Sequence, residues 1–157
     1  MKLTERAHSS PGRERYIYRA LHDVYVFLDA LDRSLLAPFE LTPLQYRVLT
    51  LLTESQTLRL TDLSDRLLVA RSTVTRLIDA LEKRSLVDRV YDENDRRAQW
   101  ISLTSDGHTL RRQIDDIHER ALKSCLADLT DAEKADMAQR LTRLGEAARQ
   151  SYRSSPE

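Results

Sequence analysis

The spacing of apolar residues along the chain predicts a protein made mainly of helices. From residue 16 to residue 36, apolar side chains recur every three or four positions, which is the spacing of one buried face of an α-helix. Pro38 ends this first helix, because the residue before a proline is pushed out of helical geometry. Thr42, Pro43 and Gln45 then have the pattern of a capping box with proline at the first helical position, so a second helix is predicted from here to about Thr53.

The next segment has the pattern of a helix-turn-helix. Residues 57–60 are predicted to pair as a short strand, and Thr61 is a suitable cap for a third helix. After a short break, Arg71 or Ser72 opens a fourth helix. The residues expected on the buried faces of these two helices are Leu63, Leu67, Val74, Leu77, Ile78 and Leu81. Two helices joined by about four residues indicate a helix-turn-helix.

A β-hairpin is predicted directly after the fourth helix. Residues 86–91 and 98–103 have the composition of strands, and residues 92–95 are a cluster of turn formers. Arg96 and Arg97 lie just beyond that turn. A hairpin in this position is the wing of a winged helix.

Two long helices are predicted to complete the chain. Thr104 can cap a fifth helix, and Thr130 with Glu133 forms a second capping box ahead of a sixth. The apolar faces comprise Leu110, Ile114, Ile117, Ala121 and Cys125 in the fifth helix and Met137, Leu141, Leu144 and Ala148 in the sixth. Gly107 is expected to let the first turn of the fifth helix approach a neighbouring segment closely.

Two stretches of the sequence resemble the MarR (multiple antibiotic resistance regulator) family of transcription regulators. One is DRRAQWISLTSDG at residues 95–107, which is similar to the family's wing signature of Asp, any residue, Arg, five further residues, Leu-Thr, two residues and Gly. The other is LLVARSTVTRLID at residues 67–79, which resembles the family's turn and recognition helix. The resemblance extends over residues 16–152. It implies a mainly α fold with a small β wing, that is, a winged helix-turn-helix with long N- and C-terminal dimerisation helices.

Two positions depart from the pattern that the resemblance implies. Leu68 stands in the turn before the recognition helix, and Ser85 stands after that helix, where glycine is frequent in such proteins. A residue other than glycine in a left-handed conformation costs roughly 1 kcal/mol, which a stable fold tolerates.

The pattern and the resemblance together predict five parts of the chain. They are a flexible N-terminal arm at 1–15, N-terminal helices for dimerisation and support at 16–56, a DNA-binding lobe at 57–104, C-terminal dimerisation helices at 105–152 and a frayed tail at 153–157. The long terminal helices carry apolar stripes that a small winged helix cannot cover, so they need a partner. The resemblance makes that partner a second copy of the chain, in a homodimer.

The composition excludes several classes of protein but does not by itself indicate nucleic-acid binding. Lys and Arg number 25, as do Asp and Glu, so a DNA-binding surface has to come from the local placement of arginines. No window approaches the roughly 18 apolar residues of a membrane span, and the N-terminus lacks the apolar core of a signal peptide. These features predict a cytoplasmic protein without membrane contact.

Catalysis is not indicated. The three glycines form no phosphate-binding loop, and no acid–base set accompanies a nucleophile. We therefore expect no enzyme, no catalytic residue and no cofactor.

Seven polar residues are candidates for contact with double-stranded DNA. The N-terminal half of a recognition helix reads base edges in the major groove, and arginines near a wing tip reach phosphate or the minor groove. The candidates are Arg71, Ser72, Thr73, Thr75 and Arg76 for the first task and Arg96 and Arg97 for the second. The alternatives are a solvated helix face for Arg71 and Arg76, and ion pairs with Asp92 or Asp95 for the wing arginines.

Five aromatic residues are candidates for an effector site. The resemblance places such a site where the first, second and fifth helices converge, with a small aromatic compound as its ligand. The candidates are Tyr18, Tyr25, Phe39, Tyr46 and Trp100. Packing in the core or in a dimer is the alternative for each of them.

The single cysteine and the four histidines indicate no further chemistry. Cys125 has no partner for an internal disulfide, which fits a reducing compartment. Its place on the apolar face of the fifth helix favours a buried structural thiol over a redox sensor. No two histidines have the four-residue spacing of a helical metal site, so no metal is expected.

These inferences favour a ligand-responsive repressor that binds a pseudo-palindromic operator as a homodimer. The alternative is a protein that keeps the winged scaffold but binds a protein partner, which the net charge of 0 leaves open. The two differ in salt dependence, because DNA affinity falls steeply as counterions are released.

Overall fold

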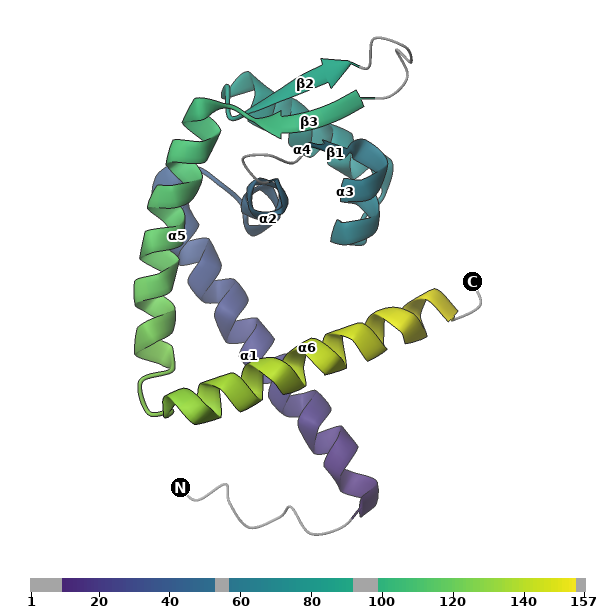
Figure 1. Cartoon of the computed structure of the whole chain (residues 1–157), viewed down its shortest axis with the longest axis vertical. Helices are drawn as coiled ribbons and strands as arrows, with labels where there is room; N and C mark the ends of the chain where they lie inside the picture. The colour runs from purple at the N-terminus through teal and green to yellow at the C-terminus, as the bar shows by residue number, and fades with distance from the viewer. Residues whose placement is uncertain (1–9, 53–56, 92–98, 155–157) are drawn as a thin grey trace. The chain divides into compact units, whose positions relative to one another are not determined.

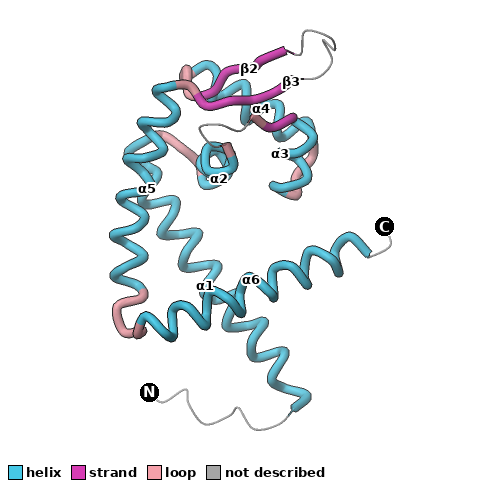
Figure 2. Tube along the Cα trace, viewed as in Figure 1, coloured by secondary structure: helices cyan, strands magenta, loops and turns pink. Residues whose placement is uncertain are grey.

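The structure, a computed structural model, describes residues 10–52, 57–91 and 99–154. Figures 1 and 2 show a mainly helical chain with one small sheet, which confirms the predicted fold class. The elements in chain order are α1 (Ser10–Leu36), the 3₁₀ helix η1 (Ala37–Phe39), α2 (Pro43–Leu51), β1 (Leu58–Arg59), α3 (Leu60–Leu67), α4 (Arg71–Lys83), β2 (Val87–Tyr91), β3 (Gln99–Leu103), α5 (Ser105–Cys125) and α6 (Asp131–Ser154).

The chain divides into two compact units, and the division falls inside α5 between Ile117 and His118. The N-terminal unit holds the sheet, the helices α1 to α4 and the first part of α5. The C-terminal unit holds the rest of α5 and α6.

The sheet is antiparallel, with strand order β1-β3-β2. Leu58 and Arg59 pair with Ile101 and Trp100, so the short strand predicted before the third helix is confirmed as the outer neighbour of β3. On its other side β3 pairs with β2 along the whole of both strands, from Val87 opposite Leu103 onward. The hairpin strands therefore lie within one residue of the predicted bounds.

The two predicted capping boxes are confirmed. At the start of α2 the Gln45 N–H donates to Thr42 Oγ1 at 3.2 Å, and the Thr42 N–H donates to Gln45 Oε1 at 2.9 Å. At the start of α6 the Glu133 N–H donates to Thr130 Oγ1 at 3.3 Å, and the Thr130 N–H donates to Glu133 Oε2 at 2.8 Å. Each box satisfies two backbone donors that the first helical turn leaves without a partner.

Two helix starts differ from the sequence prediction. α1 begins at Ser10 rather than at residue 16, because proline is tolerated in a first helical turn and the following residues favour helix. α3 begins at Leu60, so the prediction that Thr61 caps it is wrong. The Asp62 carboxylate accepts from the Arg59 N–H at 3.2 Å, and this contact stabilises the earlier start.

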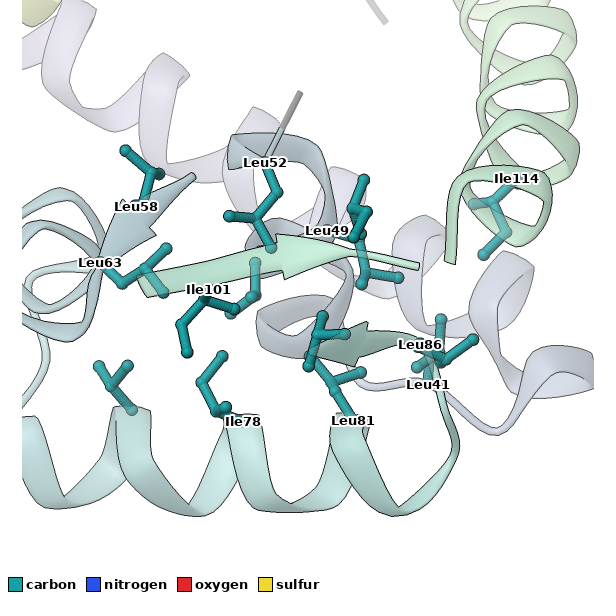
Figure 3. Close-up of a cluster of buried hydrophobic side chains, with 14 of the residues drawn as sticks. Leu41, Leu49, Leu52, Leu58, Leu63, Ile78, Leu81, Leu86, Ile101 and Ile114 are labelled. Carbon is teal, nitrogen blue, oxygen red and sulfur yellow. The ribbon is translucent and has the colours of Figure 1, made fainter. Parts of the chain in front are cut away.

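The core of the N-terminal unit is built from leucine, isoleucine and valine side chains. Figure 3 shows Ile78 and Leu81 of α4 pointing toward the sheet, where Ile101 of β3 faces the helix. The fully buried side chains are Leu36, Val48, Leu49, Leu52, Leu63, Val74, Ile78, Leu81, Val87, Ile101 and Ile114. Most of the predicted buried faces of α3 and α4 are confirmed, while Leu67 and Leu77 are only partly buried at the margin of this core.

The junction between α5 and the preceding hairpin has the structural roles that the sequence predicted for Thr104 and Gly107. Thr104 Oγ1 accepts from the Gly107 N–H at 2.9 Å and donates to the carbonyl oxygen of Ser85 at 2.6 Å. A Cβ atom on Gly107 would lie 2.0 Å from the carbonyl oxygen of Leu86. The helix start therefore packs directly on backbone, and only glycine fits there.

The C-terminal unit has no core of its own, since none of residues 118–154 is buried. Met137, Leu141 and Leu144 are exposed on α6. Cys125 is also exposed, so the prediction of a buried thiol is wrong for the single chain. The apolar face of α5 therefore ends on an exposed residue.

We expect Gly107→Ala to destabilise the fold. The new methyl group would overlap backbone rather than a mobile side chain, and overpacking of this kind costs about 1–3 kcal/mol. Gly145→Ala is the matched control: its Cβ meets nothing within 4 Å, and replacing an exposed helical glycine by alanine stabilises by about 0.5–1 kcal/mol. Urea unfolding of both variants measures the difference. Equal midpoints for the two variants would contradict the close packing at Gly107.

Candidate nucleic-acid interface

The helix α4 presents a polar surface at its N-terminal half. Its opposite face is fixed, because Val74, Ile78 and Leu81 are fully buried. The predicted base-reading residues are exposed except for Thr73, which is partly buried: they are Arg71, Ser72, Thr73, Thr75 and Arg76. Arg71 and Arg76 are both exposed to solvent in this half of α4.

One of these side chains also has a local role. Thr75 Oγ1 donates to the carbonyl oxygen of Arg71 at 3.1 Å. This bond uses the single hydroxyl donor of Thr75 and leaves its oxygen as an acceptor. Thr75 therefore offers a base an acceptor rather than a donor in this arrangement.

The turn between α3 and α4 adopts the left-handed conformation in spite of its sequence. Leu68 has a φ of 54° and is 62% exposed. The hydroxyl of Ser64 donates to the carbonyl oxygen of Val69 at 2.7 Å, and the Val69 N–H donates to the Ser64 carbonyl oxygen at 3.3 Å. These two bonds close the turn around Leu68, so glycine is not required for its geometry.

A second left-handed residue, Ser85, follows α4 with a φ of 56°. The Leu86 N–H still donates to the Leu81 carbonyl oxygen at 3.0 Å, which explains why β2 begins one residue later than predicted. Leu68 and Ser85, the two residues that stand where glycine is frequent, therefore lie in the turns directly before and after α4.

Arg89 is a residue of this region that the sequence analysis missed. It lies on β2, and its guanidinium forms ion pairs with Asp79 and, at 2.6 Å, with Glu82, both on α4. Only 16% of the Arg89 side chain is exposed. The available signal was strand alternation, since Arg89 shares the face of the buried Val87. This contact fixes the hairpin on the recognition helix.

Arg96 and Arg97, with Asp92 and Asp95, lie outside the described residues. The structure does describe the two strands on either side of this segment, β2 and β3. Next to them, Arg59 of β1 stacks on the ring of Trp100 in β3, with its guanidinium carbon 4.6 Å from the ring centroid.

The five aromatic candidates are spread over several elements. Tyr18 and Tyr25 are exposed on α1, where His22 stacks on Tyr18 with ring centroids 6.2 Å apart. Phe39 and Tyr46 are partly buried against the core. Trp100 lies on β3, opposite Arg59 of β1. This strand neighbour could not be known from spacing alone.

Tyr46 joins α2 to α5. Its hydroxyl donates to Asp115 Oδ1 at 2.5 Å, and Arg111 lies on the other side of that carboxylate with Nε 3.5 Å from Oδ2. Arg111 also donates to the carbonyl oxygen of Leu52 at 2.7 Å. Burial raises the pKa of Tyr46, and the hydrogen bond to Asp115 raises that pKa further. Tyr46 is therefore a neutral donor that holds the two helices together.

The described part of the chain has neither a candidate metal site nor a helix that could span a membrane. Residues 10–52, 57–91 and 99–154 contain no group of three or more His, Cys, Asp or Glu side chains that could hold a metal ion. None of the helices described is long and apolar enough to cross a membrane.

The chain has the fold of a winged helix-turn-helix protein. Its helices α3 and α4 form the helix-turn-helix, and the small sheet with its hairpin strands β2 and β3 lies beside them. The family model that matches is that of the MarR family, over residues 41–98. The chain is 30% identical over 128 residues to YsmB, an uncharacterized HTH-type transcriptional regulator of Bacillus subtilis. The aligned region covers 82% of this chain and 88% of YsmB. It is 32% identical over 112 residues to the homoprotocatechuate degradative operon repressor of Escherichia coli, covering 71% of this chain and 73% of that protein. The chain belongs to the MarR family of transcription regulators.

Solved structures agree in fold. The transcriptional regulator SlyA has a TM-score of 0.78 and 21% identity, covering 87% of this chain and 96% of SlyA. A MarR family protein from Bacillus stearothermophilus also has a TM-score of 0.78, with 26% identity and coverage of 89% and 98%. A variant of MarR from E. coli, solved in complex with operator DNA, has a TM-score of 0.72 and 25% identity, with coverage of 87% and 99%.

We expect Arg89→Ala to loosen the hairpin from α4. Hydrogen bonds to charged groups contribute about 1.5–3 kcal/mol, and partial solvation of the two acids reduces this to a loss of about 1–2 kcal/mol. A double-mutant cycle with Asp79→Asn in urea measures the coupling. Asp88→Ala, at an exposed position of the same strand, is the control and should cost little. If the two substitutions change the free energy of unfolding by amounts that simply add, the Arg89–Asp79 ion pair contributes nothing to stability.

Tyr46→Phe is expected to lower the free energy of unfolding by about 1 kcal/mol at neutral pH, because it removes a donor to a carboxylate. A raised folded-state pKa means that this contribution is fully present below about pH 10, the pKa of an unfolded tyrosine, and is lost as the pH rises through the folded-state value. Denaturant titrations of both proteins at increasing pH measure the change. Tyr18→Phe, at an exposed tyrosine, should show neither effect. If the difference in unfolding free energy between wild type and Tyr46→Phe grows above about pH 10, the role of Tyr46 as a neutral donor to Asp115 is refuted.

Proposed function

We propose that this protein is a sequence-specific DNA-binding regulator that represses transcription as a homodimer on a pseudo-palindromic operator and responds to a small aromatic effector. The observation that carries the proposal is the outward-facing polar half of α4 on a helix whose other face is locked in the core. The solved complex of a MarR variant with operator DNA supports the same use of this fold. Regulators of this family are not enzymes, and no catalytic residue is assigned.

The DNA contacts are divided between α4 and the wing. Arg71, Ser72, Thr73, Thr75 and Arg76 read base edges in the major groove. Arg96 and Arg97 bind phosphate or enter the adjacent minor groove. The lobe at residues 57–104 carries both sets, as the sequence analysis proposed.

The homodimer is supported by apolar residues that the single chain leaves exposed. Tyr16, Ile17, Val24 and Phe27 on α1 are each at least about half exposed, and α6 carries a further exposed apolar stripe. Burial of the helices at 16–56 and 105–152 in a two-fold assembly removes this surface from water. Two-fold symmetry then places two recognition helices about 34 Å apart, one turn of DNA.

The effector is proposed to act on the angle between the two DNA-binding lobes, and it needs different affinities for the two arrangements. Tyr18, Tyr25, Phe39, Tyr46 and Trp100 remain the proposed ligand-binding residues. Among them, Tyr46 is the residue whose hydroxyl lies at the contact between α2 and α5, where it donates to Asp115.

The test is selection of duplexes from a random DNA pool by the purified protein at moderate salt. We expect a palindrome with half-sites about ten base pairs apart. A folded dimer that enriches nothing would instead favour the protein-binding alternative, which the net charge of 0 leaves open. For an enriched duplex, the slope of log affinity against log salt should be about −0.9 per phosphate contact.

Substitutions separate base reading from phosphate contact. Arg76→Ala should relax the preference at one base position of each half-site, at a cost of about 1–3 kcal/mol. Arg97→Ala should weaken binding to all sequences and reduce the salt slope by about 1. Lys83→Ala removes a positive charge from the far end of the same helix and should leave both properties unchanged. An Arg76 variant with unaltered preference would remove Arg76 from the base-reading set.

A further inference from the structure

Arg84 joins the end of the recognition helix to the connection between α1 and α2. It directly follows α4, and its guanidinium donates from Nη2 to the carbonyl oxygen of Phe39 and from Nη1 to that of Glu40, both at 2.8 Å. The two acceptors are consecutive along the chain, so one planar guanidinium holds both at once. Arg84 is exposed and belongs to neither the DNA-contact nor the effector set proposed above.

The segment that Arg84 holds is itself fixed. Glu40 is left-handed with a φ of 53°, and its N–H donates to the Ala37 carbonyl oxygen at 3.0 Å. The Leu41 N–H donates to the Leu36 carbonyl oxygen at 3.4 Å, and both leucine side chains are buried. The arginine therefore contacts a rigid turn that leads from α1 into α2.

The backbone around Arg84 is constrained as well. Ser85 is left-handed, and its carbonyl oxygen accepts the Thr104 hydroxyl at 2.6 Å. Leu86 is buried, and Figure 3 shows it near Leu41 at this end of the core. Arg84 is thus held at the C-terminal end of α4, and its two hydrogen bonds join that end to the α1–α2 turn. Arg89, by contrast, fixes α4 to the hairpin within the same lobe.

We propose that Arg84 is a positioning residue that sets the orientation of α4 relative to the α1–α2 segment, and through it the half-site spacing that the homodimer selects. This role rests on the proposed function, since spacing has meaning only for a DNA-binding dimer. A guanidinium that donates to two carbonyl oxygens fixes direction as well as distance, whereas a lysine ammonium acts as a point charge. Arg84 does not touch DNA in this role, so the bases that each half-site prefers do not depend on it.

The test is the random-pool selection carried out with wild type, Arg84→Ala, Arg84→Lys and the control Lys83→Ala, all as full chains. Circular dichroism and thermal unfolding first establish which variants fold. For Arg84→Ala we expect the same half-site bases but a broader set of spacings, with the share of wild-type spacing reduced at least about twofold. Arg84→Lys should be intermediate, and Lys83→Ala should match wild type.

A merely structural role would lower the yield of bound duplexes without changing their spacing. A folded Arg84→Ala variant that selects the wild-type distribution of spacings therefore overturns the proposal, while the proposed function stands. If Arg84→Ala does not fold, the spacings selected by Arg84→Lys are compared with those of wild type instead, and an unchanged distribution again overturns the proposal. Failure of wild type to enrich any palindrome would refute the proposed function, and the positioning role with it.

Discussion

The burial of one face of α4 is the constraint on which the rest of the molecule depends. Val74, Ile78 and Leu81 are fully buried, and burial of each such side chain contributes about 1.5–3 kcal/mol. Rotation of the helix about its axis would expose all three, so the direction of the polar face is fixed by apolar packing. Contacts at the C-terminal end of the helix, from Glu82 and Arg84, join it to β2 and to the α1–α2 turn.

Local signals predicted most of the fold. Apolar spacing located the helices, and short-range hydrogen bonds such as those of Thr42 and Thr104 were predictable because donor and acceptor lie within three residues. The start of α3 was missed because Thr61 is a residue type typical of N-caps, whereas the N-cap is Arg59, whose N–H donates to Asp62 in the first helical turn. Cys125 was misjudged because spacing identifies an apolar face but does not show whether the same chain covers it.

The residues that spacing could not assign are arginines with distant partners. Arg84 binds carbonyl oxygens more than forty residues earlier in the chain, and Arg89 binds acids on another element. The identity of a side chain does not indicate a partner that is distant in the sequence. From the sequence, Arg84 and Arg89 were therefore indistinguishable from solvated surface residues. The candidate DNA-contact residues on α4 were proposed from helix periodicity and the family resemblance, and they are still a prediction; Arg96 and Arg97 lie outside the described residues.

The stacking of Arg59 on Trp100 gives the protein a built-in optical reporter. Trp100 is the only tryptophan of the chain, so its fluorescence arises from one place, the pairing of β1 with β3 next to the hairpin. The Arg59 guanidinium is attracted to the face of this ring, so the contact ties the position of the indole to the pairing of β1 with β3. An event that shifts β3 against β1 would change the surroundings of the indole, and with them its emission.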